Sequence, residues 1–289
     1  MKKNLTIFLL LALAAYAAFP AVATGQDSNI RCRYRFSFKK DITKKGNLYY
    51  QDTTMTLDFS GDRAVFYSEK FYLQDSTLNV APLPISIAVN PPPEFQGTKE
   101  YSRYFIDFQE STYIKFDQAI MTKAKGRGEL ELPQWTLLDA TDTICGHPCR
   151  TARAQYMGRE WTVWYATDIP VYAGPWILWG APGLILKARD SDRLFVITAT
   201  EVGTASYNRW DEIFTLSDNR NNLRSYKSMR KMETVMTRVK RSYDEDMQLN
   251  GLQGGPIKAI NPDGSVETIE LEMKYIPLIP EEYWEKNRK

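Results

Sequence analysis

The chain has 289 residues, with 37 Lys and Arg against 35 Asp and Glu and a single histidine. The first 25 residues hold two of those bases and no acid, so the remaining chain is formally neutral. A neutral chain is unlike a nucleic-acid binder, because phosphate contacts require an excess of Lys and Arg on one face.

Residues 1–25 show the pattern of a cleavable secretory signal. Lys2 and Lys3 precede an apolar run over 5–18, and small residues follow Pro20, which is the layout of a signal peptide. The apolar run of about 14 residues is shorter than the roughly 20 needed to cross a bilayer as a helix, although an uncleaved anchor is the alternative. Cleavage is expected after Ala23 or after Gly25. We therefore expect an exported protein of the periplasm or cell envelope, with no transmembrane segment in the mature chain.

The region after the signal is dominated by strand patterns. Residues 30–38 alternate apolar and polar side chains, which predicts a strand with its arginines on one face. A hairpin is expected around Gly61, since two apolar runs flank the sequence Ser-Gly-Asp-Arg. The proline-rich stretch 81–98 predicts an extended loop or lid. Further strands are expected at 104–108, 113–116, 151–156, 160–166, 184–188, 194–202 and 266–271.

One long helix is expected from about Asn222 to Met247, because apolar residues recur there at steps of three and four. Its methionine stripe contains Met229, Met232 and Met236. Such a stripe is typical of a core-facing helix, and thioethers at this spacing are also ligands for Cu(I). The predicted fold is mainly β: a single domain over 26–289, with a curved antiparallel sheet, a half-barrel or open barrel, and this helix packed against it.

Three cysteines and the histidine form the first candidate site. Cys145, His147 and Cys149 lie within five residues, and two thiolates with an imidazole suit Zn(II) or Cu(I). In an oxidising compartment two cysteines of three tend to pair. Cys32 would then join Cys145 or Cys149, or a short Cys145–Cys149 bridge would form. A metal site, a structural disulfide and free thiols all stay open at this point.

The second candidate site is the aromatic-rich segment 158–187. Gly-Pro at 174–175 and Ala-Pro-Gly at 181–183 are turn signals, so the segment is expected to be a rigid core plug or an aromatic ligand groove. The candidate ligand, partner or core residues are Trp161, Trp164, Tyr165, Pro175, Trp176, Trp179, Pro182 and Gly183.

This segment resembles the GLPGLI family of exported Bacteroidetes proteins. Residues 180–185 read Gly-Ala-Pro-Gly-Leu-Ile, which matches the motif that names the family with Ala181 in place of Leu. The similarity covers residues 144–190 and includes Cys149, Ala152, 158–159, 164–165, 169–170 and 174–176. The resemblance implies export and kinship, and it carries no activity. Cys32, Cys145 and His147 are not part of the family pattern.

No catalytic set is evident, since the chain has no Gly-x-Ser-x-Gly elbow, no phosphate-binding glycine loop and a single histidine. The leading hypothesis is a non-enzymatic envelope protein without a cofactor. It would bind a protein partner or an apolar ligand in the concavity of its sheet. The alternatives are metal handling through Cys145, His147 and Cys149, and a hydrolase of unknown class.

Overall fold

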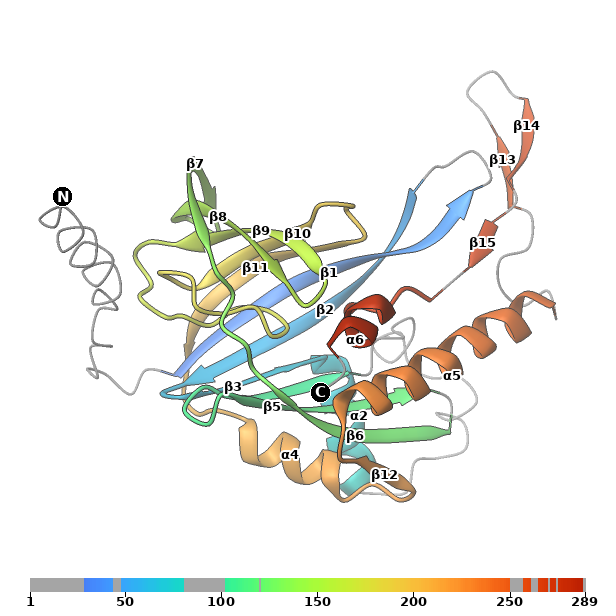
Figure 1. Ribbon diagram of the computed structural model, residues 1–289, viewed down its shortest axis with the longest axis horizontal. Coiled ribbons are helices and arrows are strands. Elements are labelled where there is room, and N and C mark those ends of the chain that lie inside the picture. The colour runs from blue at the N-terminus through green and yellow to red at the C-terminus, as the bar shows by residue number, and fades with distance from the viewer. Residues whose placement is uncertain are drawn as a thin grey trace, which may run out of the picture.

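The computed structural model describes residues 29–43, 48–80, 102–119, 121–249, 257–260, 265–269, 271–273 and 275–287. About half of them belong to one open, curved sheet, which few helices accompany (Figure 1). Its strand order is β12-β6-β5-β4-β3-β2-β1-β11-β10-β9-β8-β7, with β15 added beside β1. Neighbouring strands are antiparallel except for the parallel pair of β12 and β6. The prediction of a β-rich open sheet is confirmed.

The strands and helices have the following bounds. The strands of the sheet are β1 (Asn29–Thr43), β2 (Leu48–Ser60), β3 (Arg63–Tyr67), β4 (Arg103–Asp107), β5 (Thr112–Ala119), β6 (Thr122–Glu129), β7 (Thr136–Ile144), β8 (His147–Tyr156), β9 (Arg159–Ala166), β10 (Ile185–Asp190), β11 (Phe195–Ala205), β12 (Leu223–Tyr226) and β15 (Leu271–Met273). A separate hairpin joins β13 (Ile257–Ile260) to β14 (Val266–Ile269). The helices are α2 (Glu69–Val80), α4 (Trp210–Asp218), α5 (Met229–Leu249) and α6 (Glu281–Lys286).

The alternation predicted for residues 30–38 holds in β1. Cys32, Tyr34 and Phe36 point into the main core and are almost fully buried. Arg31 and Arg33 point to the other side, where Arg31 binds Asp58 of β2 with a nitrogen–oxygen distance of 2.6 Å. Because successive residues of a strand face opposite sides, β1 separates an inner face that carries the main core from an outer face. The hairpin around Gly61 is also confirmed, since β2 and β3 pair on either side of it.

Two helices that the sequence patterns did not predict cover part of the outer face. Helix α2 packs on β2, and α4 packs on β3. Phe105 of β4 meets Trp210 and Phe214 of α4 edge-on, with ring centroids 5.1 and 5.2 Å apart. These contacts form a second, smaller core that is distinct from the inner one.

The long helix begins later than the periodicity predicted. Residues 223–226 form strand β12, in which Leu223 pairs with Lys123 of β6. The helix starts at Met229, where the Ser228 hydroxyl accepts a weak hydrogen bond of 3.5 Å from the Lys231 backbone N–H. Serine is favoured at the residue before a helix because its side-chain oxygen accepts a hydrogen bond from a free backbone N–H of the first turn. The expected start at Asn222 is therefore wrong by about two turns of helix.

Helix α5 packs on the inner face of β5 and β6 (Figure 1). Met229, Met232 and Met236 are almost fully buried in the main core, which confirms the structural interpretation of this stripe. Strand β6 accommodates the helix because it has glycine at 126. A Cβ atom there would lie 2.7 Å from the Met232 sulfur.

Two predicted features lie outside the described residues: the signal peptide at 1–25 and the proline-rich lid at 81–98. Among the residues that are described, no helix combines the length and apolarity required to cross a membrane.

Candidate functional site

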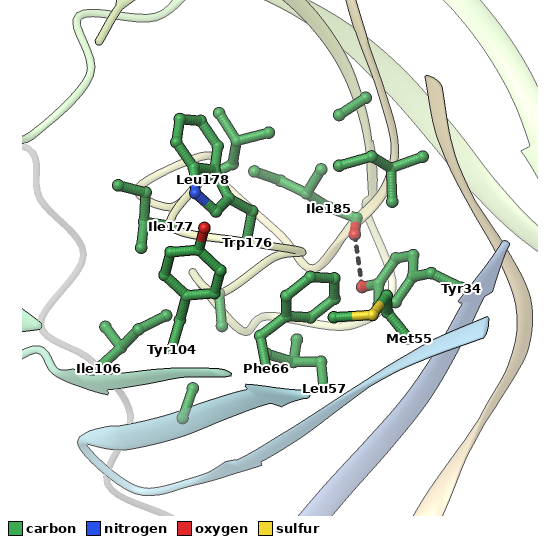
Figure 2. Close-up of a cluster of buried hydrophobic side chains, with 14 of the residues drawn as sticks. Tyr34, Met55, Leu57, Phe66, Tyr104, Ile106, Trp176, Ile177, Leu178 and Ile185 are labelled. Atoms are coloured by element: carbon green, nitrogen blue, oxygen red, sulfur yellow. Dashed lines mark hydrogen bonds between the residues drawn. The ribbon is translucent and has the colours of Figure 1, made fainter. Parts of the chain in front are cut away.

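The aromatic-rich segment fills the inner face of the sheet. Between the end of β9 and the start of β10, residues 167–184 cross this face as a loop. Trp176, Ile177 and Leu178 of the loop are 0% exposed. Figure 2 shows them facing Tyr104 and Ile106 of β4, with other side chains of β1, β2 and β3 nearby. The described centre of the sheet is therefore a packed core, as the core-plug interpretation requires.

Glycine is required at two turns of this loop. A Cβ atom on Gly183 would lie 1.9 Å from the backbone oxygen of Ala166, and one on Gly174 would lie 2.9 Å from the backbone oxygen of Leu178. Neither neighbour is a flexible side-chain end, so a larger residue would displace the backbone. Trp176 itself adopts a left-handed conformation, with φ of +57°. Tertiary packing fixes this conformation, because a bulky residue rarely adopts it otherwise.

Aromatic contacts and one buried hydrogen bond join the loop to the strands. Trp176 packs on Trp161 of β9 with ring centroids 5.5 Å apart. The Tyr34 hydroxyl of β1 donates a 2.8 Å hydrogen bond to the backbone oxygen of Ile185, drawn as a dashed line in Figure 2. Tyr165, Pro175 and Gly183 are buried as well, whereas Pro182 is exposed. Five of the eight predicted motif residues are thus buried.

Trp179 lies at the margin of this core. It is partly exposed, and its indole N–H donates to the backbone oxygen of Glu131 over 2.9 Å. Its ring packs on Phe108, with centroids 5.4 Å apart.

Arg159, which belongs to the conspicuous Gly-Arg pair of the motif, holds the C-terminal segment. Its guanidinium donates to the backbone oxygens of Leu278 and Pro277 over 2.7 and 2.8 Å, and it lies 3.3 Å from a carboxylate oxygen of Asp190. Burial lowers the pKa of Arg159, and Asp190 opposes this effect. The adjacent Gly158 has no room for a side chain, since a Cβ would lie 2.9 Å from Tyr283. Gly158 and Arg159 therefore hold residues 277–283 against the inner face of the sheet.

The Cys145, His147 and Cys149 side chains do not converge. The three cysteines, including Cys32, are free thiols in this structure. The His147 ring Nδ1 lies 2.8 Å from Asp168, and this hydrogen bond lowers the pKa of Asp168. Within the described part of the chain, no three His, Cys, Asp or Glu side chains are placed to hold a metal ion. The metal hypothesis gains no support from this geometry.

Four charged side chains are buried between α5 and the sheet. The Lys115 ammonium of β5 lies 2.8 Å from Glu233 and 3.2 Å from Asp117, and Lys240 lies 3.0 Å from Asp117. Burial alone would raise the pKa of Asp117, but Lys115 and Lys240 outweigh it and lower this pKa. Each carboxylate is neutralised by a lysine beneath the helix, so removal of any one partner would leave a buried charge unpaired.

Trp164 points to the outer face, unlike Trp161 and Trp176. It is partly exposed, and the Lys187 ammonium lies 4.5 Å from its ring centroid, with the Arg189 guanidinium at 5.7 Å. Strand register places Lys187 beside both Trp164 and Thr198, and Thr198 beside Arg35. Two residues earlier on β9, Thr162 pairs with Arg189 of β10 on one side and with Arg153 of β8 on the other.

We call Arg35, Arg153, Trp164, Lys187 and Arg189 the outer basic face. Two of its cations have acidic neighbours: Asp142 is 3.5 Å from Lys187, and Glu160 is 3.9 Å from Arg153. The helices α2, α4 and α5 make their main contacts with other strands, so none of them shields it. The face combines two exposed cations, Arg35 and Arg153, with two partly exposed cations and one partly exposed aromatic side chain.

The sequence analysis identified Trp164 as a candidate site residue, but it did not predict that four cations would gather around it. Lys187 and Arg189 alternate with the buried Leu186 and Ala188, so the period-two pattern contained the signal. Their proximity to Arg35 could not be predicted from the sequence pattern, because it depends on the pairing of β1 with β11.

The comparisons with known proteins define no family for this chain. No family model matches it, and no curated protein matches it. Among solved structures it is similar to PNGF-II in two crystal forms, each with a TM-score of 0.47 and 16% sequence identity. The match covers 70% of this chain but only 32% and 31% of the PNGF-II chains, so this chain spans about a third of their length. A likeness this distant carries no functional argument.

Proposed function

We propose that this chain is an exported, non-enzymatic protein of the cell envelope that binds an acidic protein partner on its outer basic face. One observation carries the proposal: an aromatic ring and four cations share a sheet face that no described helix covers, and only Lys187 and Arg153 of these cations have an acid within 4 Å in the described structure. Tryptophan and arginine are enriched at the energetically dominant positions of interfaces, and complementary charge accelerates and orients association.

Of the two occupants expected from the sequence, the partner has more support than an apolar ligand. A ligand in the concavity would have to displace Trp176, Ile177 and Leu178, which are 0% exposed in the core. The outer basic face requires no such displacement. Its alternation of cations with threonine suits a polar, negatively charged surface rather than an apolar molecule.

Poly-L-glutamate is a simple probe for an acidic polypeptide surface. We expect titration calorimetry to detect binding that weakens steeply with added salt, because exposed charges are screened. The double variant Lys187→Glu/Arg189→Glu should weaken it by about tenfold or more. The matched control is Arg230→Glu/Lys231→Glu, which changes the net charge equally on the exposed side of α5. An equal loss of poly-L-glutamate affinity in both double variants would indicate an effect of net charge and contradict the assignment of the outer basic face.

Two further probes separate the acidic protein from other anionic partners. Polygalacturonate represents an acidic glycan, and vesicles of phosphatidylglycerol represent an anionic membrane. Binding of either one in place of poly-L-glutamate would reject a protein partner. In cells, a photo-crosslinking residue at Thr162 should form one discrete adduct that the Lys187→Glu/Arg189→Glu background abolishes, whereas the same residue at Thr234 on α5 should form none.

Export is the second part of the proposal and is supported by the signal pattern at residues 1–25. Mass spectrometry of the protein from the envelope fraction should find an N-terminus at Thr24 or Gln26. An intact Met1 N-terminus in the cytoplasmic fraction would contradict it. The GLPGLI resemblance supports the same location.

A further inference from the structure

Cys145 occupies an unusual place at the tip of the β7–β8 hairpin. It forms a two-residue turn with Gly146, and both residues have positive φ, at +53° and +83°. Such turns favour Asn, Asp and Gly, because other residues adopt this conformation at a cost. The turn directs the Cys145 sulfur toward β11, where it lies 3.3 Å from the backbone oxygen of Ala199. The curl of the sheet therefore brings the hairpin tip back against a strand that is not its neighbour.

Cys32 lies on the strand beside that contact. In the β1–β11 register, Ala199 pairs with Tyr34, which is two residues from Cys32 and faces the same inner side. Burial is the main reason that the pKa of the Cys32 thiol is raised, and the Cys145 thiol contributes as well. The negative charge of Glu201 also raises the pKa of both the Cys32 and the Cys145 thiol. The two sulfurs thus share one neighbourhood over β1 and β11.

Cys149 also lies near Cys145, which contributes to its raised pKa, but its own hydrogen bond and strand pairing lie away from β1 and β11. Its thiol donates to the backbone oxygen of His147 on its own strand, over 3.4 Å. Across the sheet it pairs with Asp142 of β7 and Ala166 of β9, and not with β1 or β11. Burial raises its pKa to about 11.

We propose that Cys32 and Cys145 form a disulfide that fastens the β7–β8 hairpin tip to β1. The oxidant is a disulfide, either a small molecule or a thiol oxidase. The more accessible Cys145 thiolate attacks it, forms a mixed disulfide and releases one thiolate. Cys32 then loses its proton and attacks the Cys145 sulfur, which expels the second thiolate. Two protein thiols are oxidised and one disulfide is reduced to two thiols.

The bridge would stabilise the open end of the sheet. It closes a loop of about 110 residues, and bridges across long loops restrict the unfolded chain most strongly. It does not depend on the proposed partner, so the two proposals can fail separately.

The test uses the purified mature chain, reduced and then treated with oxidised glutathione. Non-reducing peptide mapping should find one bridge, between Cys32 and Cys145, with Cys149 alkylated after denaturation. The melting temperature should rise by about 5 °C or more relative to the reduced protein. The Cys149→Ser variant should keep both results, whereas Cys145→Ser should lose both.

A bridge that contains Cys149, or three thiols that remain fully alkylatable after oxidation, would overturn the proposal. Cys145→Ser and Cys149→Ser each remove one thiol near the hairpin tip, so each is the control for the other. Neither requires replacement of the fully buried Cys32.

Discussion

Strand β9 presents two tryptophans, three residues apart, in opposite environments. Trp161 is 0% exposed on the inner face and packs on Trp176. Trp164 is partly exposed on the outer face beside Lys187 and Arg189. The comparison shows that the aromatic density of residues 158–187 has two separate origins: one set of rings builds the core, and one ring belongs to a charged surface.

The two sides should respond differently to substitution. On the inner side, atoms are in contact on all sides, so a change of size alters the free energy of unfolding. On the outer side, side chains contact solvent, so the same change alters binding and leaves stability nearly constant. The predictions below test this contrast in order of decreasing effect on stability.

Gly183→Ala should have the largest effect. Its Cβ would lie 1.9 Å from the Ala166 backbone oxygen, which cannot move without breaking the turn. We expect a loss of about 5 kcal/mol in unfolding free energy, or no folded protein at all, measured by urea denaturation. The matched control is Gly203→Ala in β11, where no atom lies within 4 Å of the added methyl group. Equal stability of the two variants would show that the turn adapts.

Trp176→Ala should follow, with a loss of about 4 kcal/mol from the cavity that it leaves in the core. The contrasting variant is Trp164→Ala, which removes a ring of the same size from the outer face. Its expected cost is about 1 kcal/mol, mainly from cation–π contacts with Lys187 and Arg189. Similar losses in the two variants would contradict the division of β9 into a core side and a surface side.

Asp117→Asn tests charge on the inner side and should cost about 3 kcal/mol near neutral pH, because two buried lysines lose their shared anion. The pKa of Asp117 is lower in the folded chain than its ordinary value of 3.8. The carboxylate therefore stabilises the fold above that value, and the stabilisation is lost as the pH falls through the lowered pKa. Urea denaturation at several acidic pH values should show the gap between wild type and variant closing. A gap that stays constant would contradict the assignment.

The sequence predicted the features that depend on neighbouring residues. Alternation in 30–38 and the turn around Gly61 define β1 and the β2–β3 hairpin, because both are local patterns. Helix α5 was predicted from its apolar stripe, but its start was wrong because residues 223–226 have a strand partner, β6, about 100 residues away in sequence. Helix α2 has almost no amphipathic pattern, whereas α4 carries Trp210, Ile213 and Phe214 at helical spacing, a pattern that the sequence analysis missed.

The candidate site was predicted less completely, for the same reason. Cys145, His147 and Cys149 are close in sequence, yet their side chains bind the Ala199 backbone oxygen, the Asp168 carboxylate and the His147 backbone oxygen respectively. Lys115 and Asp117 face inward from β5 and pair with each other, but their further partners, Glu233 and Lys240, belong to α5, which is 118 residues away in the Lys115–Glu233 pair. Spacing along the chain cannot reveal either arrangement.

Lys187→Gln is expected to have the smallest effect on stability. Its side chain is about a third exposed, and its contacts are a 3.5 Å ion pair with Asp142 and the face of Trp164. Exposed ion pairs contribute little to folding, so thermal and urea unfolding should change by no more than about 0.5 kcal/mol. Binding of poly-L-glutamate should nevertheless weaken several-fold, since the ammonium charge sits at the centre of the outer basic face. Lys115→Gln is the inward counterpart: it removes a buried ammonium between Asp117 and Glu233 and should reduce stability strongly. If Lys187→Gln instead destabilised the fold as much as Lys115→Gln, the outer residues would belong to the core and the contrast between the two faces would fail.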